Sequence, residues 1–500
     1  MDTKSTKSAI KDKWFVIPVI LLLVYFLIRF IDAIQIVYYF PINNLGNDYS
    51  GHVIRLHFLK EYGFHNIVPN WFNGFPILKS YPFFWYFFAL PIAYLIDNVQ
   101  IALLIAFAIT YLLVLWILFL IGKKEKFSKV QVIVFFTFLF ANPITISYFL
   151  RLGKVVELLG WFFFFILFLL FLYYKEKNLD KSFIFLFTII YASIFYTHIL
   201  VFIVSTLMVF SFFIFKRDLS QKIKIFFGSL FTLIITSYFW YPLLKNLNER
   251  AISTTLPLKW LVINKPEYFS DKIMAFIIPI VFWIILYFYC TTSENKKKEL
   301  LFFSVPFIFS IVYFLRIAPF IPFINRPTPD SYNFFFMFIS IYMLLKIDFS
   351  FLNKNLIKVV PYTLVLLSLL FIFISMTSTP FFTKSTQEGE DAIKLLPYLK
   401  DKFMVINPNF HKGTFYAYSA LFFNSSTPDG WVEEEIPLSY INMLTDIQDN
   451  FNSGKCDEVN NALKRLNNRY LMLFNNNCDD IKCNYKIQKR VNTACLVAID

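Results

Sequence analysis

Asp48, His52 and Arg55 are the first residues of the chain whose types and spacing could do chemistry. They lie in a polar stretch, residues 41–82, and their separations place them on one face of a helix. A carboxylate at Asp48 can take a proton from an acceptor hydroxyl or hold a metal ion. The alternatives are that Asp48 caps the helix and that His52 is only an interfacial histidine. We expect this stretch to form one wall of an active site at the outer membrane surface.

A second group of ionisable residues lies in the segment RLGKVVE, which contains Arg151, Lys154 and Glu157. Such residues are costly at membrane depth and are a functional hypothesis by default. Two cations and an acid are what a phosphate-bearing lipid and a reacting hydroxyl need. The alternative is that the two cations are interfacial anchors and that Glu157 complements a helix dipole.

The remaining single residues give weaker signals. Lys79 and Arg326 are cations that could hold a phosphate group. His198 interrupts an apolar run, where it could bind substrate or make an interhelical hydrogen bond. The pair Trp71 and Phe72 lies among turn residues, and we expect it to be exposed.

The composition predicts a membrane protein rather than a soluble one. The chain has 500 residues, of which 58% are hydrophobic, 21% aromatic and only 16% charged. Its net charge of +14 fits cytoplasmic loops rich in Lys and Arg better than nucleic-acid binding. The sequence contains neither a Walker A motif nor GxGxxG, which argues against a cytoplasmic nucleotide-driven enzyme.

Five short Lys-rich segments divide the apolar part of the chain. They are Lys123–Lys129, Lys175–Lys181, Lys216–Lys224, Lys296–Lys298 and Lys346–Lys358. We place all five inside, together with the N-terminus, because Lys and Arg collect in cytoplasmic loops. After a first helix from Trp14, helices are expected at residues 99–121, 129–150, 156–174, 182–196, 197–215, 225–243, 272–290, 300–316, 332–346 and 359–377.

This arrangement gives about 11 crossings. It requires that residues 83–96 form a juxtamembrane or re-entrant helix and that residues 182–215 form an outward hairpin turning near His198. Four outer pieces then face one another above that hairpin: residues 41–82, 151–157, 244–271 and 316–332. The fold class is therefore an all-α polytopic membrane domain, residues 1–377, followed by an extracytoplasmic domain, residues 378–500.

The C-terminal domain is expected to be a small α/β or α+β module. A helix is predicted at DAIKLLPYLK, strands at FMVINP and ACLVAID, and a helix leading into a strand at CDEVNNALKRLNNRYLMLF. Four cysteines, Cys456, Cys478, Cys483 and Cys495, fit one or two disulfides in an oxidising compartment. A zinc site is the competing interpretation.

The layout resembles the GT-C superfamily of membrane glycosyltransferases. Asp48 in NDYSGHVIR and Glu157 in RLGKVVELL stand where that superfamily has outer-loop acids. The runs PNWFNGFPILKSYP and KRLNNRYLMLF are more narrowly similar to prokaryotic, often archaeal, membrane proteins known as 6-pyruvoyl-tetrahydropterin synthase-related, and to YfhO-like proteins.

The resemblance implies an inverting transfer of a sugar from a polyprenyl-phosphate donor to a glycan, lipid or protein at the outer membrane face. Asp48 would be the catalytic base and Glu157 a second acid. The donor phosphate and substrate would contact His52, Arg55, Lys79, Arg151, Lys154, His198 and Arg326. No cofactor is certain, and a divalent metal, Mg²⁺ or Mn²⁺, is compatible with the site. The alternatives are a non-catalytic scaffold or lipid-binding protein with this fold, and a lipid or glycan transporter.

Overall fold

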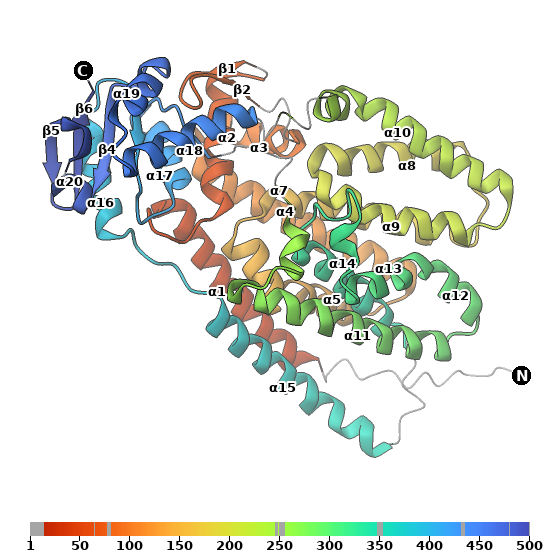
Figure 1. The fold of residues 1–500 in the computed structure, drawn as a ribbon. Coiled ribbons are helices and arrows are strands. Elements are labelled where there is room, and N and C mark those ends of the chain that lie inside the picture. Colours follow the sequence, from red (N-terminus) through yellow and green to blue (C-terminus); the bar gives the residue numbers. More distant parts are fainter. Residues whose placement is uncertain are drawn as a thin grey trace, which may run out of the picture. The chain divides into compact units, whose positions relative to one another are not determined.

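The computed structural model describes residues 15–64, 66–77, 82–245, 249, 256–347, 354–431, 436–479 and 481–499 (Figure 1). Lys79, one of the predicted phosphate ligands, lies outside the described residues. The chain divides into two compact units. Unit 1 comprises residues 1–31, 108–237 and 256–381, and unit 2 comprises residues 32–107, 238–255 and 382–500.

Unit 1 is built from apolar helices, as the sequence predicts. These are α5 (Lys129–Phe140), α6 (Pro143–Thr145) with the π-helix η2 (Ile146–Arg151), α7 (Val155–Tyr174), α8 (Lys181–Thr197), α9 (Ile199–Phe215), α11 (Phe269–Thr292), α12 (Lys296–Phe302), α13 (Ser304–Phe314), α14 (Pro329–Leu344) and α15 (Lys354–Ser378). Helices α1 (Val16–Tyr39), α4 (Val99–Glu125) and α10 (Leu219–Lys245) have residues in both units.

Six of the described helices, namely α1, α4, α7, α10, α11 and α15, are long and apolar enough to cross a membrane. A seventh span is possible if α5 and the segment 143–151 count as one span, bent by 58°. Pro143 causes the break, because proline has no backbone N–H to donate to the preceding turn. The side-chain amide of Asn142 donates hydrogen bonds to the carbonyls of Phe138 and Leu139 instead. The predicted count of about 11 is therefore not confirmed: α8, α9 and α13 have 17, 17 and 11 residues, short of the ~20 that a span needs.

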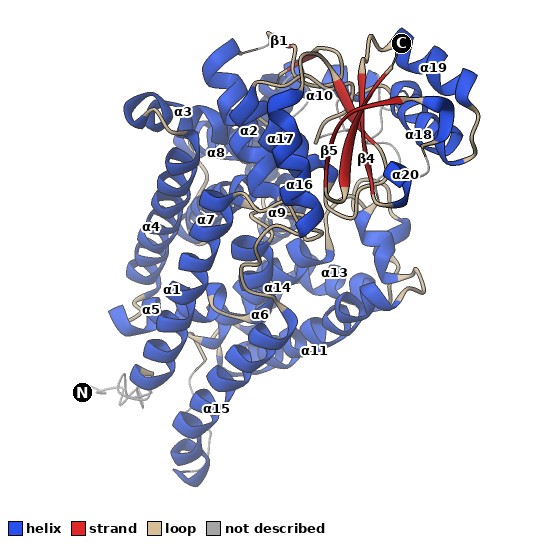
Figure 2. Cartoon of the chain, turned by 90° about the vertical axis from the view of Figure 1, so that its left-hand side faces the viewer, coloured by secondary structure: helices blue, strands red, loops and turns tan. Residues whose placement is uncertain are grey.

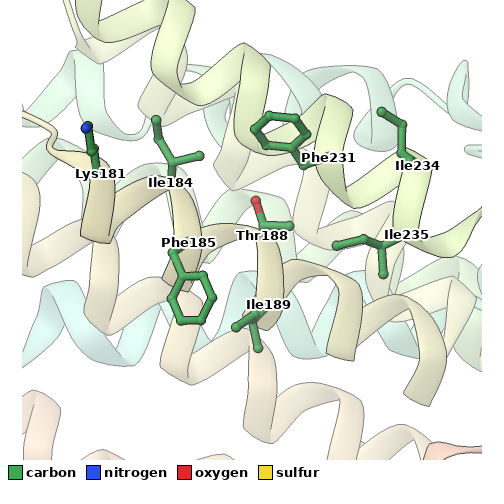
Figure 3. Close-up of a pocket in the computed structure, with 8 residues that line it drawn as sticks. All are labelled: Lys181, Ile184, Phe185, Thr188, Ile189, Phe231, Ile234 and Ile235. Carbon is green, nitrogen blue, oxygen red and sulfur yellow. The ribbon is translucent and has the colours of Figure 1, made fainter.

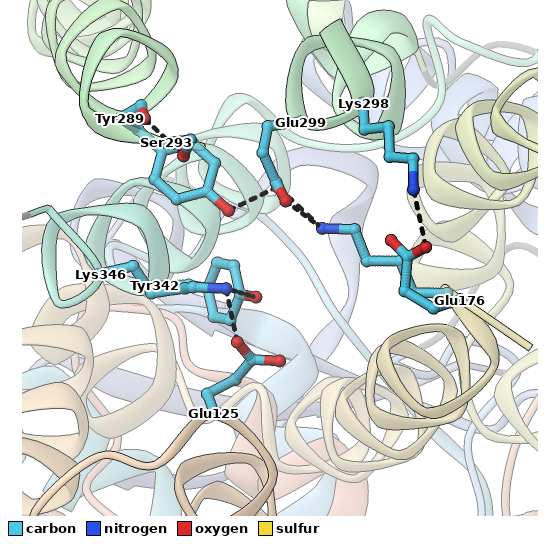
Figure 4. Close-up of polar contacts among 9 residues, drawn as sticks. Glu125, Glu176, Tyr289, Ser293, Lys298, Glu299, Tyr342 and Lys346 are labelled. Atoms are coloured by element: carbon cyan, nitrogen blue, oxygen red, sulfur yellow. Dashed lines mark hydrogen bonds and ion pairs between the residues drawn. The ribbon is translucent and has the colours of Figure 1, made fainter. Parts of the chain in front are cut away.

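The Lys-rich segments meet at one end of unit 1, as expected (Figure 4). Lys346 pairs with Glu125 at 2.5 Å and Lys175 with Glu299 at 2.7 Å. Lys298 pairs with Glu176 at 2.9 Å, and the Lys216 Nζ donates to backbone carbonyls at the end of α7. These contacts join the ends of α4, α7, α9 and α14 with the start of α12. We call this the Lys-rich end.

Unit 2 contains α2 (Asp48–Tyr62) and a hairpin of β1 (Ile67–Val68) and β2 (Phe75–Pro76), both from the first polar stretch, and α3 (Phe84–Ile96), which follows it. Its C-terminal part is a four-stranded sheet of order β3-β4-β6-β5. Its strands are β3 (Phe403–Val405), β4 (Tyr470–Phe474), β5 (Lys486–Val491) and β6 (Ala494–Ala498), of which only β3 and β4 are parallel. The expected strands and helices are present, and β5 and two helices, α17 (Lys412–Phe423) and α18 (Leu438–Asn452), were not predicted from the sequence.

Helices cover both sides of this sheet (Figure 2). On one side, α18 (Leu438–Asn452) and α19 (Cys456–Arg465) bury a core that includes Ile447, Phe451 and Leu463. On the other side lie α16 (Gln387–Leu395) and α17 (Lys412–Phe423). The four cysteines form two disulfides, Cys456–Cys483 and Cys478–Cys495, so the disulfide prediction is confirmed and the zinc alternative is wrong.

Candidate functional site

Asp48 is the first residue of α2, and it does not cap the helix. The Asn47 side chain does so instead, by accepting a hydrogen bond from the Ser50 backbone nitrogen at 3.3 Å. The Asp48 side chain is partly buried, whereas His52 and Arg55 of the same helix are 5% and 3% exposed. The predicted helix is therefore confirmed, and the carboxylate stands at its positive end.

Two aromatic rings from the C-terminal part of unit 2 pack against Gly46 and Gly51, the glycines that flank Asp48 in the sequence. A Cβ atom on Gly46 would stand 2.9 Å from Cδ2 of His411, and one on Gly51 would stand 2.7 Å from Nε1 of Trp431. The rings contact each other, with centroids 4.4 Å apart. Since real Cβ atoms do not approach so closely, glycine at these two positions allows both rings to reach α2.

The segments that carry these rings are held in place by polar contacts. The Asp429 carboxylate is fully buried, pairs with Lys412 Nζ at 2.9 Å and accepts the Gly430 backbone nitrogen at 2.8 Å. The His411 backbone nitrogen donates to the carbonyl of Asn43 at 2.8 Å. These contacts hold the backbone next to each ring in place at the start of α2.

The pKa of His411 is below its usual value. Burial is the larger cause, and the Lys412 ammonium adds to it, whereas the nearby Asp48 carboxylate raises the pKa. His411 is therefore mostly neutral at pH 7, and its Nδ1 contacts the hydroxyl and backbone nitrogen of Thr414, each at 3.2 Å. A neutral imidazole beside a carboxylate can accept or relay a proton.

Two expectations about the first polar stretch change with the structure. Trp71 and Phe72 are 0% and 4% exposed, so the expectation of an exposed pair is wrong. They are buried within unit 2, where Phe72 packs against Gly430 and Trp71 Nε1 donates to the Tyr416 carbonyl at 3.5 Å. His52 Nδ1 lies 2.8 Å from the Tyr86 hydroxyl and so links α2 to α3.

Glu157 lies in a buried polar cluster of unit 1. Its side chain is 1% exposed and accepts hydrogen bonds from Tyr148 Oη, from Ser331 Oγ at 2.9 Å and from Trp161 Nε1 at 3.3 Å. His198 Nε2 at the α8–α9 turn lies 3.8 Å from it. Two of the four predicted outer pieces, residues 151–157 and 316–332, thus meet here with the tip of the predicted hairpin. We call these residues the Glu157 cluster.

Lys154 and Asp330 lie beside this cluster. Asp330, in the first turn of α14 and ahead of the predicted crossing, has its pKa raised to about 7 by burial, then by the carboxylates of Asp271 and Glu157. Lys154 opposes that rise. The predicted cations Arg151 and Arg326 are buried and partly buried, respectively, in the same unit. Glu157 and Asp48 belong to different units, so their shared cavity stays a prediction.

Several of these residues could not be selected from the sequence alone. Asp330 lies within an expected outer loop, but nothing in its local sequence sets it apart. His411 could have been noticed, because it is the one histidine of the C-terminal domain. Trp431 follows a glycine in DGW, a weak pattern. Among the residues that the structure describes, no group of three or more His, Cys, Asp or Glu could hold a metal ion.

Solved structures share this fold. The chain resembles the arabinofuranosyltransferase AftD from mycobacteria, with a TM-score of 0.55 and 12% identity over 91% of this chain and 35% of that one. It also resembles the oligosaccharyltransferase AglB of Archaeoglobus fulgidus, solved with an inhibitory peptide and a dolichol-phosphate, with a TM-score of 0.54 and 11% identity over 91% of this chain and 69% of that one. No family model and no curated protein matches the chain.

These likenesses, at 11–12% identity, show that the chain shares its fold with the two enzymes. The chain spans about a third of the length of the arabinofuranosyltransferase. The sequence predicted a fold shared with glycosyltransferases, and that likeness in fold is confirmed.

Proposed function

We propose that the protein is a membrane glycosyltransferase that moves a sugar from a polyprenyl-phosphate donor to an acceptor hydroxyl with inversion. The carrying observation is that Asp48, at the start of α2, lies near His411, and that the contacting rings of His411 and Trp431 pack against the flanking residues Gly46 and Gly51. A carboxylate beside two aromatic rings offers a base for a hydroxyl and a flat surface for a sugar ring. The fold shared with two glycosyltransferases supports the reaction class.

In this proposal Asp48 takes the proton of the acceptor hydroxyl as that oxygen attacks the anomeric carbon. The bond from that carbon to the phosphate oxygen breaks, and the phosphate leaves as an anion. Arg151 and Lys154 are the proposed cations for that anion, joined by Lys79 and Arg326. His52 and Arg55, both buried in α2, would act by holding the helix rather than by contacting substrate.

Glu157 has a different environment from Asp48. Because its carboxylate is buried and already accepts three hydrogen bonds, we assign it the positioning of the start of α14, through Ser331, and of the α8–α9 turn, through His198. Asp330, with a pKa of about 7, is better suited than Glu157 to exchange a proton at this end of unit 1. The burial of the Glu157 carboxylate and its three hydrogen bonds also favour the second possibility, a non-catalytic protein that retains the fold.

The proposed placement has the N-terminus and the Lys-rich end in the cytoplasm and the C-terminal domain outside the cell. The clustering of the Lys-rich segments and the two disulfides support it. The narrower similarity to 6-pyruvoyl-tetrahydropterin synthase-related and YfhO-like proteins is part of the proposal. A metal requirement can be tested by adding a chelator to the same assay.

The experiment uses membranes that contain the full chain and a set of polyprenyl-phosphate sugars with a radioactive sugar. Transfer of label into a product other than the donor, together with release of polyprenyl phosphate, is the expected result. If no donor in the set is consumed above the level of membranes without the protein, the scaffold interpretation takes its place.

A further inference from the structure

An apolar groove runs between α8 and α10 on the surface of unit 1 (Figure 3). It has a volume of about 520 Å³, and its walls are Ile and Phe side chains from both helices. Phe185, Ile234 and Phe231 are 64%, 57% and 45% exposed, so the walls face outward. The groove's one charged residue is Lys181, at one end.

Near Thr188, which lines the groove, the two helices are in close contact. A Cβ atom on Gly228 would stand 2.5 Å from Phe187, so α10 approaches α8 there more closely than a larger residue would allow. Thr188 Oγ1 donates to the Gly228 carbonyl at 3.2 Å, and Thr232 Oγ1 does so at 2.9 Å. Both hydroxyls thus donate their protons to a backbone carbonyl, so Thr188 has no proton left to donate to a polar ligand in the groove.

The length of the groove matches one leaflet of a bilayer. Its residues on α8 run from Lys181 to Ile189, which is about 12 Å along a helix, and half of a hydrocarbon core is about 15 Å. Lys181 is the first residue of α8 and is exposed at the Lys-rich end. Lys224 lies at the same end, where its Nζ donates to the carbonyl of Leu179 at 2.5 Å.

We propose that the groove binds one anionic phospholipid, with an acyl chain along the Ile and Phe walls and its phosphate at Lys181. The charge of Lys181 stands where the phosphate of a lipid in the leaflet at the Lys-rich end would lie. The groove is separate from the proposed donor site, because α8 carries Lys181 at one end and the α8–α9 turn with His198 follows its other end, about 24 Å away. The lipid would be a permanent neighbour of the fold rather than a substrate.

The test measures lipid retention by the full-length protein, purified in detergent, with native mass spectrometry. Phosphatidylglycerol and phosphatidylcholine are added separately to wild type, to Lys181→Gln and to Lys129→Gln. Lys129 is the matched control, since it is exposed at the first residue of α5, also follows a Lys-rich segment and does not line the groove. We expect retention of one phosphatidylglycerol to fall at least fivefold in Lys181→Gln only, with phosphatidylcholine unchanged.

A second measurement places the lipid without relying on a variant. Phosphatidylglycerol with a photoreactive group in its acyl chain should cross-link to peptides that contain residues 184–189 or 231–235. Equal retention by wild type and Lys181→Gln, cross-links elsewhere, or displacement of phosphatidylglycerol by equimolar polyprenyl phosphate would each overturn the proposal. None of these readouts needs transferase activity, so this proposal can fail while the proposed function stands.

Discussion

Gly51 of α2 lies directly against the indole of Trp431, so closely that a Cβ atom on Gly51 would stand 2.7 Å from Nε1. The two residues are 380 positions apart, and both belong to unit 2. A glycine inside a helix costs about 0.5–1 kcal/mol relative to alanine, so its presence here has a packing reason. That reason is the approach of the ring to the helix turn that begins with Asp48.

The first prediction concerns this contact. Gly51→Ala should lower the stability of the protein by about 1–3 kcal/mol, because overpacking outweighs the gain in helix propensity. In a Trp431→Ala background the same change should be neutral or stabilising. Thermal unfolding of wild type, the two single variants and the double variant, followed by fluorescence in detergent, gives the coupling free energy between positions 51 and 431. Additive effects of the two substitutions would show that the rings do not meet α2 in this way.

The second prediction concerns pH. The pKa of Asp330 is raised from its ordinary value of 3.8 to about 7 in the folded state. Between these two pH values the folded protein keeps a proton on Asp330 that the unfolded protein has already released. Asp330 therefore stabilises the fold least at high pH, and its contribution is lost as pH rises towards 7. Asp330→Asn should raise stability at pH 8 by on the order of 1–3 kcal/mol and change it little at pH 4.

The control for this pH effect is Asp218→Asn, an exposed aspartate of the same unit at the Lys-rich end. Its stability should follow wild type at both pH values, because exposed charges contribute little. A gain at pH 8 that is the same for both variants would mean that the environment of Asp330 is not special.

The third prediction concerns the ion pairs at the Lys-rich end. The Lys175 and Glu299 side chains are 11% and 15% exposed, whereas the Lys298 and Glu176 side chains are 47% and 63% exposed. Glu299→Gln should cost about 2–4 kcal/mol, since it leaves a largely buried ammonium without its carboxylate. Glu176→Gln is the matched control and should cost less than about 1 kcal/mol. Thermal unfolding of the two variants side by side decides whether burial sets this difference.

The fourth prediction concerns the disulfides. Cys478 and Cys495 are 2% and 0% exposed within the core of the C-terminal sheet, whereas Cys456 and Cys483 are partly exposed. A mild reductant should therefore open Cys456–Cys483 first, as alkylation and mass spectrometry will show. Replacing Cys478 and Cys495 together with alanine should cost about 2–4 kcal/mol. Earlier reduction of the buried pair would contradict the packing described above.

The sequence predicted most helices of unit 1, because long apolar runs between Lys-rich segments leave little choice of structure. It could not give the number of crossings, since α8, α9 and α13 are apolar but too short for length to decide. It also could not give the bend after Phe140, which depends on the hydrogen bonds from the Asn142 side chain to the carbonyls of Phe138 and Leu139. Strand β5 escaped notice because its residues, Lys486–Val491, are mostly polar and exposed.

The acids of the site were found from sequence, but their surroundings were not. Asp48 and Glu157 looked alike as isolated carboxylates. Only tertiary contacts show that one is partly exposed and that the other is buried and hydrogen-bonded by Tyr148, Ser331 and Trp161. The burial of Trp71 likewise depends on residues more than 340 positions away, such as Tyr416. Local pattern contains no information about such distant partners.

The most direct test of the proposed function compares Asp48→Asn with Asp97→Asn in the polyprenyl-phosphate sugar transfer assay. Asp97 is the control because it is an exposed residue of the same unit, at the end of α3, with a left-handed backbone that asparagine tolerates. The account predicts that Asp48→Asn lowers the transfer rate at least ~100-fold, with unfolding temperature unchanged, and that Asp97→Asn keeps the wild-type rate. A wild-type transfer rate in Asp48→Asn would contradict the assignment of Asp48 as the catalytic base.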